Sequence, residues 1–142
     1  MKPVSQLLKA HSGTLWCLRP DMTVFDALKQ LADHEVGALM VMQDEALVGV
    51  FSERDYTRKI ALQGRSSKET LVADIMSRNL IVVAPKTSTL DCMALMSEKR
   101  IRHLPVVDQG KVLGMISMRD LMGDIIADHE LTIAQLESYI QS

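Results

Sequence analysis

The chain contains one seven-residue phrase twice, at a spacing of 65 residues. GVFSERD at residues 49–55 is matched by GMISMRD at residues 114–120, and the alignment continues in both directions without a gap. A repeat at a fixed spacing indicates one supersecondary unit used twice, in which each copy needs the other to bury its apolar face. We therefore expect two similar halves, each with its own candidate site.

Composition restricts what such a chain can be. With 142 residues, 47% hydrophobic and 24% charged, the chain has the length and balance of one globular domain. A net charge of −2 gives no basic face for nucleic acid, and no apolar run approaches the roughly 20 residues of a membrane span. The first residues lack the apolar core of a signal peptide, so we expect a cytoplasmic protein in which Cys17 and Cys92 are free thiols.

Each half is predicted to fold as β-α-β-β-α, which gives a mixed α/β (α+β) domain with small sheets packed against helices. The apolar runs suited to strands are 15–18, 38–42 and 46–51 in the first half, and 80–83, 104–107 and 112–116 in the second. Apolar residues at helical spacing predict helices at 24–34, 53–62, 88–97 and 121–127. The expected organisation is a lead-in helix (1–14), repeat 1 (15–64), a linker with a short helix (65–79), repeat 2 (80–128) and a helical tail (129–142).

The repeated phrase is the candidate ligand site, because it falls where a predicted strand is followed by a predicted helix. Its serine and aspartate, Ser52 and Asp55 or Ser117 and Asp120, have the spacing of a helix-capping box. The same residues also suit a nucleoside phosphate, since a helix N-terminus attracts phosphate and a carboxylate can accept hydrogen bonds from a ribose diol. Capping requires neither the glycine nor the arginine of the phrase. Their joint repetition therefore favours a ligand site, with these remaining members: Gly49, Gly114, Arg54 and Arg119.

Residues 15–128 resemble the cystathionine-β-synthase (CBS) domain family, as a stand-alone tandem pair. The resemblance rests on the two phrases and on RIRHLPVVD at residues 100–108, which is similar to the family's pattern around the second strand. It implies two repeats related by pseudo-twofold symmetry, with regulatory clefts between them. In that family the ligands are adenosine derivatives: AMP, ADP, ATP, NAD(H) or S-adenosylmethionine. A homodimer and a separate, unknown effector protein are implied as partners.

The resemblance also assigns roles to residues of this sequence. Asp55 and Asp120 would hold the ribose, and Ser52 and Ser117 would face ribose or phosphate. The adenine base would lie beside apolar residues near the first strand of each repeat, which here are Leu18 and Val83.

The two halves differ most at the start of their second strands. Arg102 and His103 of repeat 2 align with Gly37 and Ala38 of repeat 1, and basic residues at this place in the family commonly meet phosphate. The alternative is a solvated basic patch on a loop. A second difference sets Arg58-Lys59 of repeat 1 against Gly123-Asp124 of repeat 2. We expect two unequal sites, of which one is better suited to a multiply charged phosphate.

The sequence allows three functions to be weighed: an enzyme, a nucleotide sensor and a protein-interaction scaffold. The sequence contains no phosphate-binding P-loop, serine nucleophile elbow or zinc-protease motif, and its histidines lack metal-ligand spacing, so neither an enzyme nor a metal site is expected. The preferred hypothesis is a regulatory sensor of an adenine nucleotide. The alternative is a protein-interaction scaffold that keeps the fold without a ligand. Trp16 allows either a core position or stacking on a base.

Overall fold

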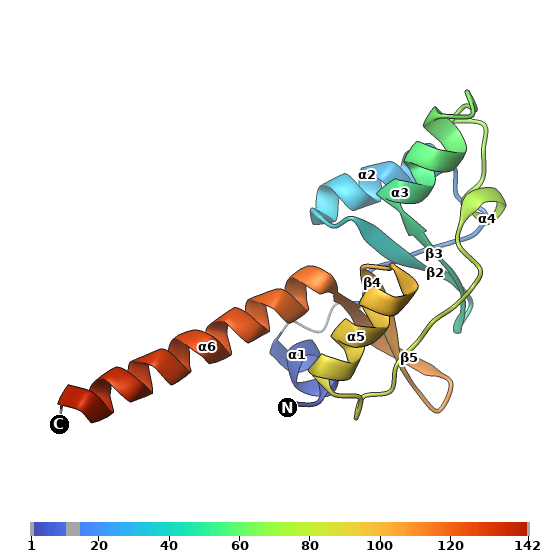
Figure 1. Ribbon diagram of the computed structural model, residues 1–142. Coiled ribbons are helices and arrows are strands. Elements are labelled where there is room, and N and C mark those ends of the chain that lie inside the picture. Colours follow the sequence, from blue (N-terminus) through green and yellow to red (C-terminus); the bar gives the residue numbers. More distant parts are fainter. Residues whose placement is uncertain (1, 11–14, 142) are drawn as a thin grey trace. The chain divides into compact units, whose positions relative to one another are not determined.

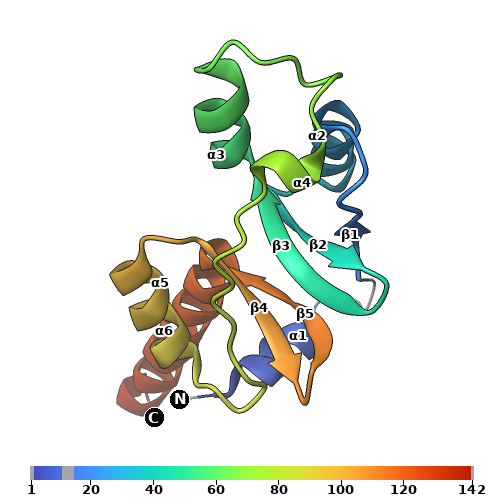
Figure 2. The ribbon, with the colours of Figure 1, turned by 90° about the vertical axis from the view of Figure 1, so that its right-hand side faces the viewer.

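The computed structural model describes residues 2–10 and 15–141, and Figures 1 and 2 show it from two directions. The chain forms two compact units, each described below by itself. Of the described residues, one unit contains 15–82 together with 107–113, and the other contains 2–10, 83–106 and 114–141. The predicted end of the lead-in, residue 14, lies outside the described residues.

The unit that contains repeat 1 is a three-stranded sheet with helices. Its strands lie in the order β1-β2-β3, where β1 and β2 are parallel and β2 and β3 form an antiparallel hairpin. Its elements are β1 (Cys17–Leu18), α2 (Val24–His34), β2 (Ala38–Gln43), β3 (Ala46–Ser52), α3 (Glu53–Tyr56), the π-helix η1 (Thr57–Ala61) and α4 (Val72–Ile75).

Local sequence explains how α2 is positioned in this unit. The Thr23 hydroxyl accepts a hydrogen bond from the Asp26 amide at 3.2 Å, so the helix begins at the predicted cap. Val24, Ala27 and Leu31 recur at helical spacing and are buried in the apolar core of the unit. The helix ends at Glu35, whose φ of 55° lies in the left-handed region and turns the chain toward β2.

The unit that contains repeat 2 has a two-stranded sheet and longer helices. Its elements are α1 (Val4–Ala10), α5 (Thr89–Lys99), β4 (His103–Asp108), β5 (Lys111–Ser117) and α6 (Met118–Gln141). The tip of the β4–β5 hairpin, residues 107–113, is grouped with the other unit. Ser88 caps α5 by accepting from the Asp91 amide at 3.0 Å, as predicted. The N-terminal segment is tied to α6, because Lys2 Nζ donates to Asp124 Oδ1 at 2.7 Å.

Three elements differ from the sequence prediction. The strand expected at 80–83 is reduced to a single parallel bridge between Val83 and Val106, next to Pro105, which has no N–H to extend the pairing. The helix expected at 53–62 becomes a π-helix after its first turn, with the Leu62 amide donating to the Thr57 carbonyl at 3.0 Å. The helix expected at 121–127 and the tail form one continuous helix, α6.

Candidate functional site

Both copies of the repeated phrase lie at a junction between a strand and a helix, as predicted. Ser52 ends β3 and Ser117 ends β5. In each copy the serine hydroxyl accepts from the aspartate amide, at 3.2 Å for Asp55 and 3.1 Å for Asp120. Each carboxylate accepts in return from the serine amide, at 3.0 and 2.9 Å respectively. Both serine–aspartate pairs therefore form the capping box that the sequence allowed.

The two repeated glycines make room for neighbours within their own units. A Cβ on Gly49 would lie 2.6 Å from Met76 Sδ and 3.1 Å from the Ser77 carbonyl oxygen. A Cβ on Gly114 would lie 2.9 Å from Leu8 Cδ2. The contacts with Met76 and Leu8 are shorter than those that real Cβ atoms make, so a side chain at either position would push its neighbour aside, and local packing gives a reason for both glycines.

Asp55 stands at the centre of a closed polar cluster in repeat 1. The residue is only 7% exposed, and its Oδ2 accepts from the Ser52 amide at 3.0 Å and the Ser52 hydroxyl at 3.1 Å. Its Oδ1 accepts from the Ser77 hydroxyl at 3.1 Å and lies 3.3 Å from Lys59 Nζ, which also donates to the Ile75 carbonyl at 2.8 Å. These contacts use the four acceptor positions of a carboxylate and tie α3 to the segment after α4.

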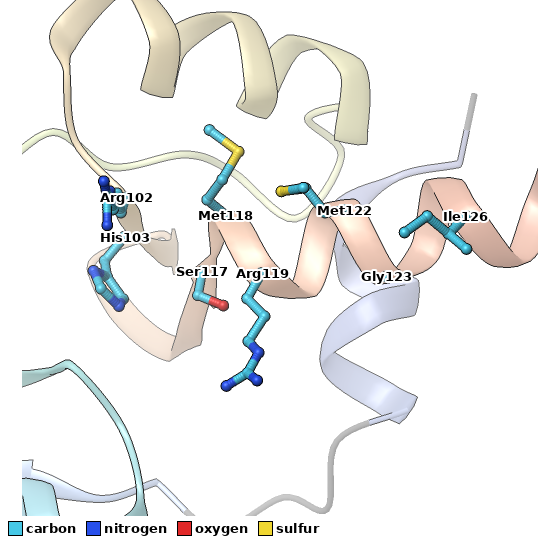
Figure 3. Close-up of a pocket in the computed structure, with 8 residues that line it drawn as sticks. All are labelled: Arg102, His103, Ser117, Met118, Arg119, Met122, Gly123 and Ile126. Carbon is cyan, nitrogen blue, oxygen red and sulfur yellow. The ribbon is translucent and has the colours of Figure 1, made fainter.

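Repeat 2 instead presents a hollow of about 620 Å³ where β4 and β5 meet the start of α6. Figure 3 shows its polar side chains gathered at this junction and its apolar ones continuing along α6. The polar lining consists of Arg102, His103, Ser117 and Arg119. The remaining lining residues are Met118, Met122, Gly123 and Ile126. The volume is within the range of small-molecule sites, about 300–1,000 Å³.

The surroundings of His103 in this hollow change the pKa of its imidazole. Burial lowers the pKa of His103 below its ordinary value, and the charge of Arg102 lowers it further, while Asp120 opposes both. The imidazole is therefore neutral near pH 7, beside the cationic Arg102. An anion placed between the two would offset the charge repulsion and favour protonation of the histidine.

The structure brings some predicted site residues together and separates others. Arg102, His103, Ser117 and Arg119 line one hollow, and Asp120 is close enough to His103 to influence its pKa. Leu18 and Val83, predicted to flank a base, are buried. Arg54 lies exposed in the first turn of α3, next to the Asp55 cluster.

Sequence reasoning did not identify the apolar part of the hollow. Met118, Met122 and Ile126 recur every four residues and therefore share one face of α6. That spacing was the available signal, but methionine at helical spacing is typical of a core.

Trp16 does not lie in the core, the first of its two predicted places. Its side chain is 42% exposed, and its ring stacks on His34 of α2 with centroids 4.0 Å apart and an interplanar angle of 10°. The face of the indole that a base would cover on that side is already occupied.

The described residues were also compared with the requirements of a metal site, a reactive thiol and a membrane span. Among residues 2–10 and 15–141 no group of three or more histidine, cysteine, aspartate or glutamate side chains could hold a metal, and His11 lies outside them. Cys17 and Cys92 are free, and burial raises the pKa of both thiols. Within the same part of the chain, no helix has the length and apolar character to span a bilayer.

Comparison with known proteins identifies the family. The CBS domain model matches residues 12–62 and 72–127, and the chain belongs to the CBS domain family as a tandem pair. It is 44% identical over 137 residues to the mitochondrial CBS domain-containing protein CBSX3 of Arabidopsis thaliana, covering 93% of this chain and 66% of that protein. It is 34% identical over 102 residues to YhcV of Bacillus subtilis, covering 72% of each.

The fold is likewise that of solved CBS proteins. A CBS-domain signal-transduction protein from Burkholderia ambifaria matches with a TM-score of 0.86 and 45% identity, over 89% of this chain and 96% of that one. The predicted mixed α+β fold is thereby confirmed. This chain is a CBS-domain pair, a class of regulatory and signal-transduction modules.

Proposed function

We propose that this CBS pair is a sensor of an adenine nucleotide and that its principal binding site is the hollow of repeat 2. The observation that carries the proposal is the composition of that hollow: two guanidinium groups, an imidazole and a hydroxyl meet an apolar face of α6. Arginine suits phosphate oxygens, and methionine and isoleucine suit the face of a purine. Asp120, at the same helix start, is the proposed acceptor for the ribose.

Repeat 1 is proposed to bind nucleotide more weakly. A ribose approaching Asp55 would have to displace the Ser77 hydroxyl and Lys59, which already satisfy Oδ1. In repeat 1 the position equivalent to His103 is Ala38, which is buried in β2 and whose side chain has no hydrogen-bond donor. We therefore propose one high-affinity site per chain, and a change of conformation on binding that an effector protein reads.

The experiment is a calorimetric titration of nucleotide-stripped protein with AMP, ADP, ATP, NAD⁺, NADH and S-adenosylmethionine. Arg102→Ala should weaken binding of the preferred compound by roughly 10- to 150-fold, the loss of one charge-assisted hydrogen bond. Arg58→Ala is the matched control, because Arg58 is an exposed arginine of η1 in repeat 1. Loss of binding in Arg58→Ala alone would move the site to repeat 1.

The scaffold hypothesis remains the second candidate, favoured by the closed Asp55 cluster, which needs no ligand to satisfy its carboxylate. It predicts a folded protein that binds none of the six compounds. Such a result would refute the sensor proposal.

A further inference from the structure

Beyond Ile126, which lines the hollow, α6 presents an exposed surface that the nucleotide site does not use. All residues from 126 to 140 are exposed, although the segment is a continuous helix. In Figures 1 and 2 it extends past α1 and α5 of its own unit. An isolated helix has marginal stability in water unless its apolar face is packed, so we expect this segment to pack against a partner.

Four apolar residues and one histidine of this segment recur at heptad spacing, while Leu131 and Tyr139 fall outside it. Ile126, Ile133 and Ile140 recur every seven residues, and His129 and Leu136 fall three residues after the first two isoleucines. These are the a and d positions of a coiled coil, and we call the five residues the α6 seam. Isoleucine at a with leucine at d favours two parallel strands. Ile126 also lines the hollow, so the seam begins where the hollow ends.

Charge narrows the choice of partner. After Arg119 the sequence contains Asp120, Asp124, Asp128, Glu130 and Glu137 but no lysine or arginine. An acidic helix is repelled by anionic lipid and nucleic acid, since surface-binding helices carry basic polar faces. A period of 3.5 residues is that of a helix packed on another helix, and a second copy of α6 supplies the same apolar positions in the same order.

The flanking residues select the orientation of such a pair. Glu130 and Glu137 occupy e positions, and Ile125 and Thr132 occupy the g positions that would face them in a parallel pair. An antiparallel pair would set glutamate against glutamate across the same seam. Like charges at this distance are destabilising, so the parallel arrangement is favoured.

We propose that α6 pairs with α6 of a second copy of this chain as a parallel two-stranded coiled coil through the α6 seam. Two heptads are too short to be stable as free helices, so the pairing depends on α6 being continuous with a folded unit.

Disulfide trapping in the full chain tests both contact and orientation. Ile140→Cys places a thiol in the seam, where the two copies face each other in a parallel pair. Ser138→Cys is the control, because Ser138 lies at an f position on the outer side of the same turn. The native cysteines are present in both variants. The Ile140→Cys dimer should form under mild oxidation and the Ser138→Cys dimer should not.

A second pair of variants separates this interface from any other. Ile133→Glu, made in the Ile140→Cys chain, should weaken pairing roughly a hundredfold, because each copy then carries a charge into the seam. Leu131→Glu is a close match, since Leu131 is 59% exposed and Ile133 is 55% exposed, but Leu131 lies outside the seam. It should leave cross-linking unchanged. Equal cross-linking by both cysteines, an equal effect of both glutamates, or cosedimentation with anionic vesicles without cross-linking would overturn the proposal.

Discussion

The Asp55 cluster makes a quantitative prediction about stability. Ser77→Ala removes the hydroxyl that donates to Asp55 Oδ1 at 3.1 Å, across 22 residues of sequence. Ser77 is exposed, so the bond is worth about 0.5–1.5 kcal/mol, the ordinary net value for a hydrogen bond in a protein. For a chain of 142 residues this corresponds to a fall in Tm of roughly 1–6 °C.

A double-mutant cycle isolates that contribution. Asp55→Ala removes the same bond and also the carboxylate half of the capping box, which accepts from the Ser52 amide and hydroxyl, and this adds about 1 kcal/mol. Its ion pair with Lys59 adds little, because the Lys59 side chain is 39% exposed. Chemical denaturation of both single variants and the double variant should give a coupling free energy of about 1 kcal/mol.

The control for this cycle is Ser88→Ala. Ser88 caps α5, in the unit that does not contain Asp55, so its loss should cost about 1 kcal/mol and add to the loss of Asp55 without coupling. Additive effects of Ser77→Ala and Asp55→Ala, within about 0.3–0.5 kcal/mol, would show that the cluster does not hold Asp55.

Three further predictions concern His103 and the repeated glycines. Affinity for NAD⁺, whose diphosphate does not titrate near pH 6, should rise as pH falls toward the lowered pKa of His103 and level off below it, because the bound anion favours the imidazolium. Calorimetry across pH should find this slope absent in His103→Gln. Without ligand, the free energy of unfolding should fall as pH drops below about 6.5, since the unfolded chain takes up the His103 proton first, and denaturation of His103→Gln should show a shallower fall. Gly49→Ala should lower stability by about 1–3 kcal/mol in chemical denaturation, because its Cβ would lie 2.6 Å from Sδ of the buried Met76 and 3.1 Å from the Ser77 carbonyl oxygen. Gly114→Ala should have a smaller effect, because Leu8 Cδ2 is the end of a side chain that can turn aside. A Gly49→Ala variant as stable as the parent would contradict the packing role of this glycine.

Much of the fold could be predicted because its signals are local. Thr23 and Ser88 mark helix starts through their own side chains, and the hairpins follow from continuous apolar runs. The strand expected at 80–83 failed because an apolar run does not show how many backbone partners are available, and only Val83 has a strand-like bridge.

For the candidate site, too, the local features could be predicted from the sequence and the tertiary contacts could not. The phrase itself, and the difference between Arg102-His103 and Gly37-Ala38, can be found by aligning the sequence with itself. The engagement of Asp55 by Ser77 is a tertiary contact across 22 residues, and no local pattern announces it. Lys59, four residues after Asp55, was the one local hint of that cluster.

Nucleotide binding in the hollow of repeat 2 can be followed through the imidazole signals of two histidines. His103 lies in the hollow, while His34 of repeat 1 is stacked on Trp16. Proton NMR of the imidazole signals during titration with ATP, assigned with His103→Gln, should show His103 shifting in proportion to saturation and its pKa rising, with His34 unmoved. A saturable shift of His34 with His103 unchanged, or no shift of either signal, would contradict the account.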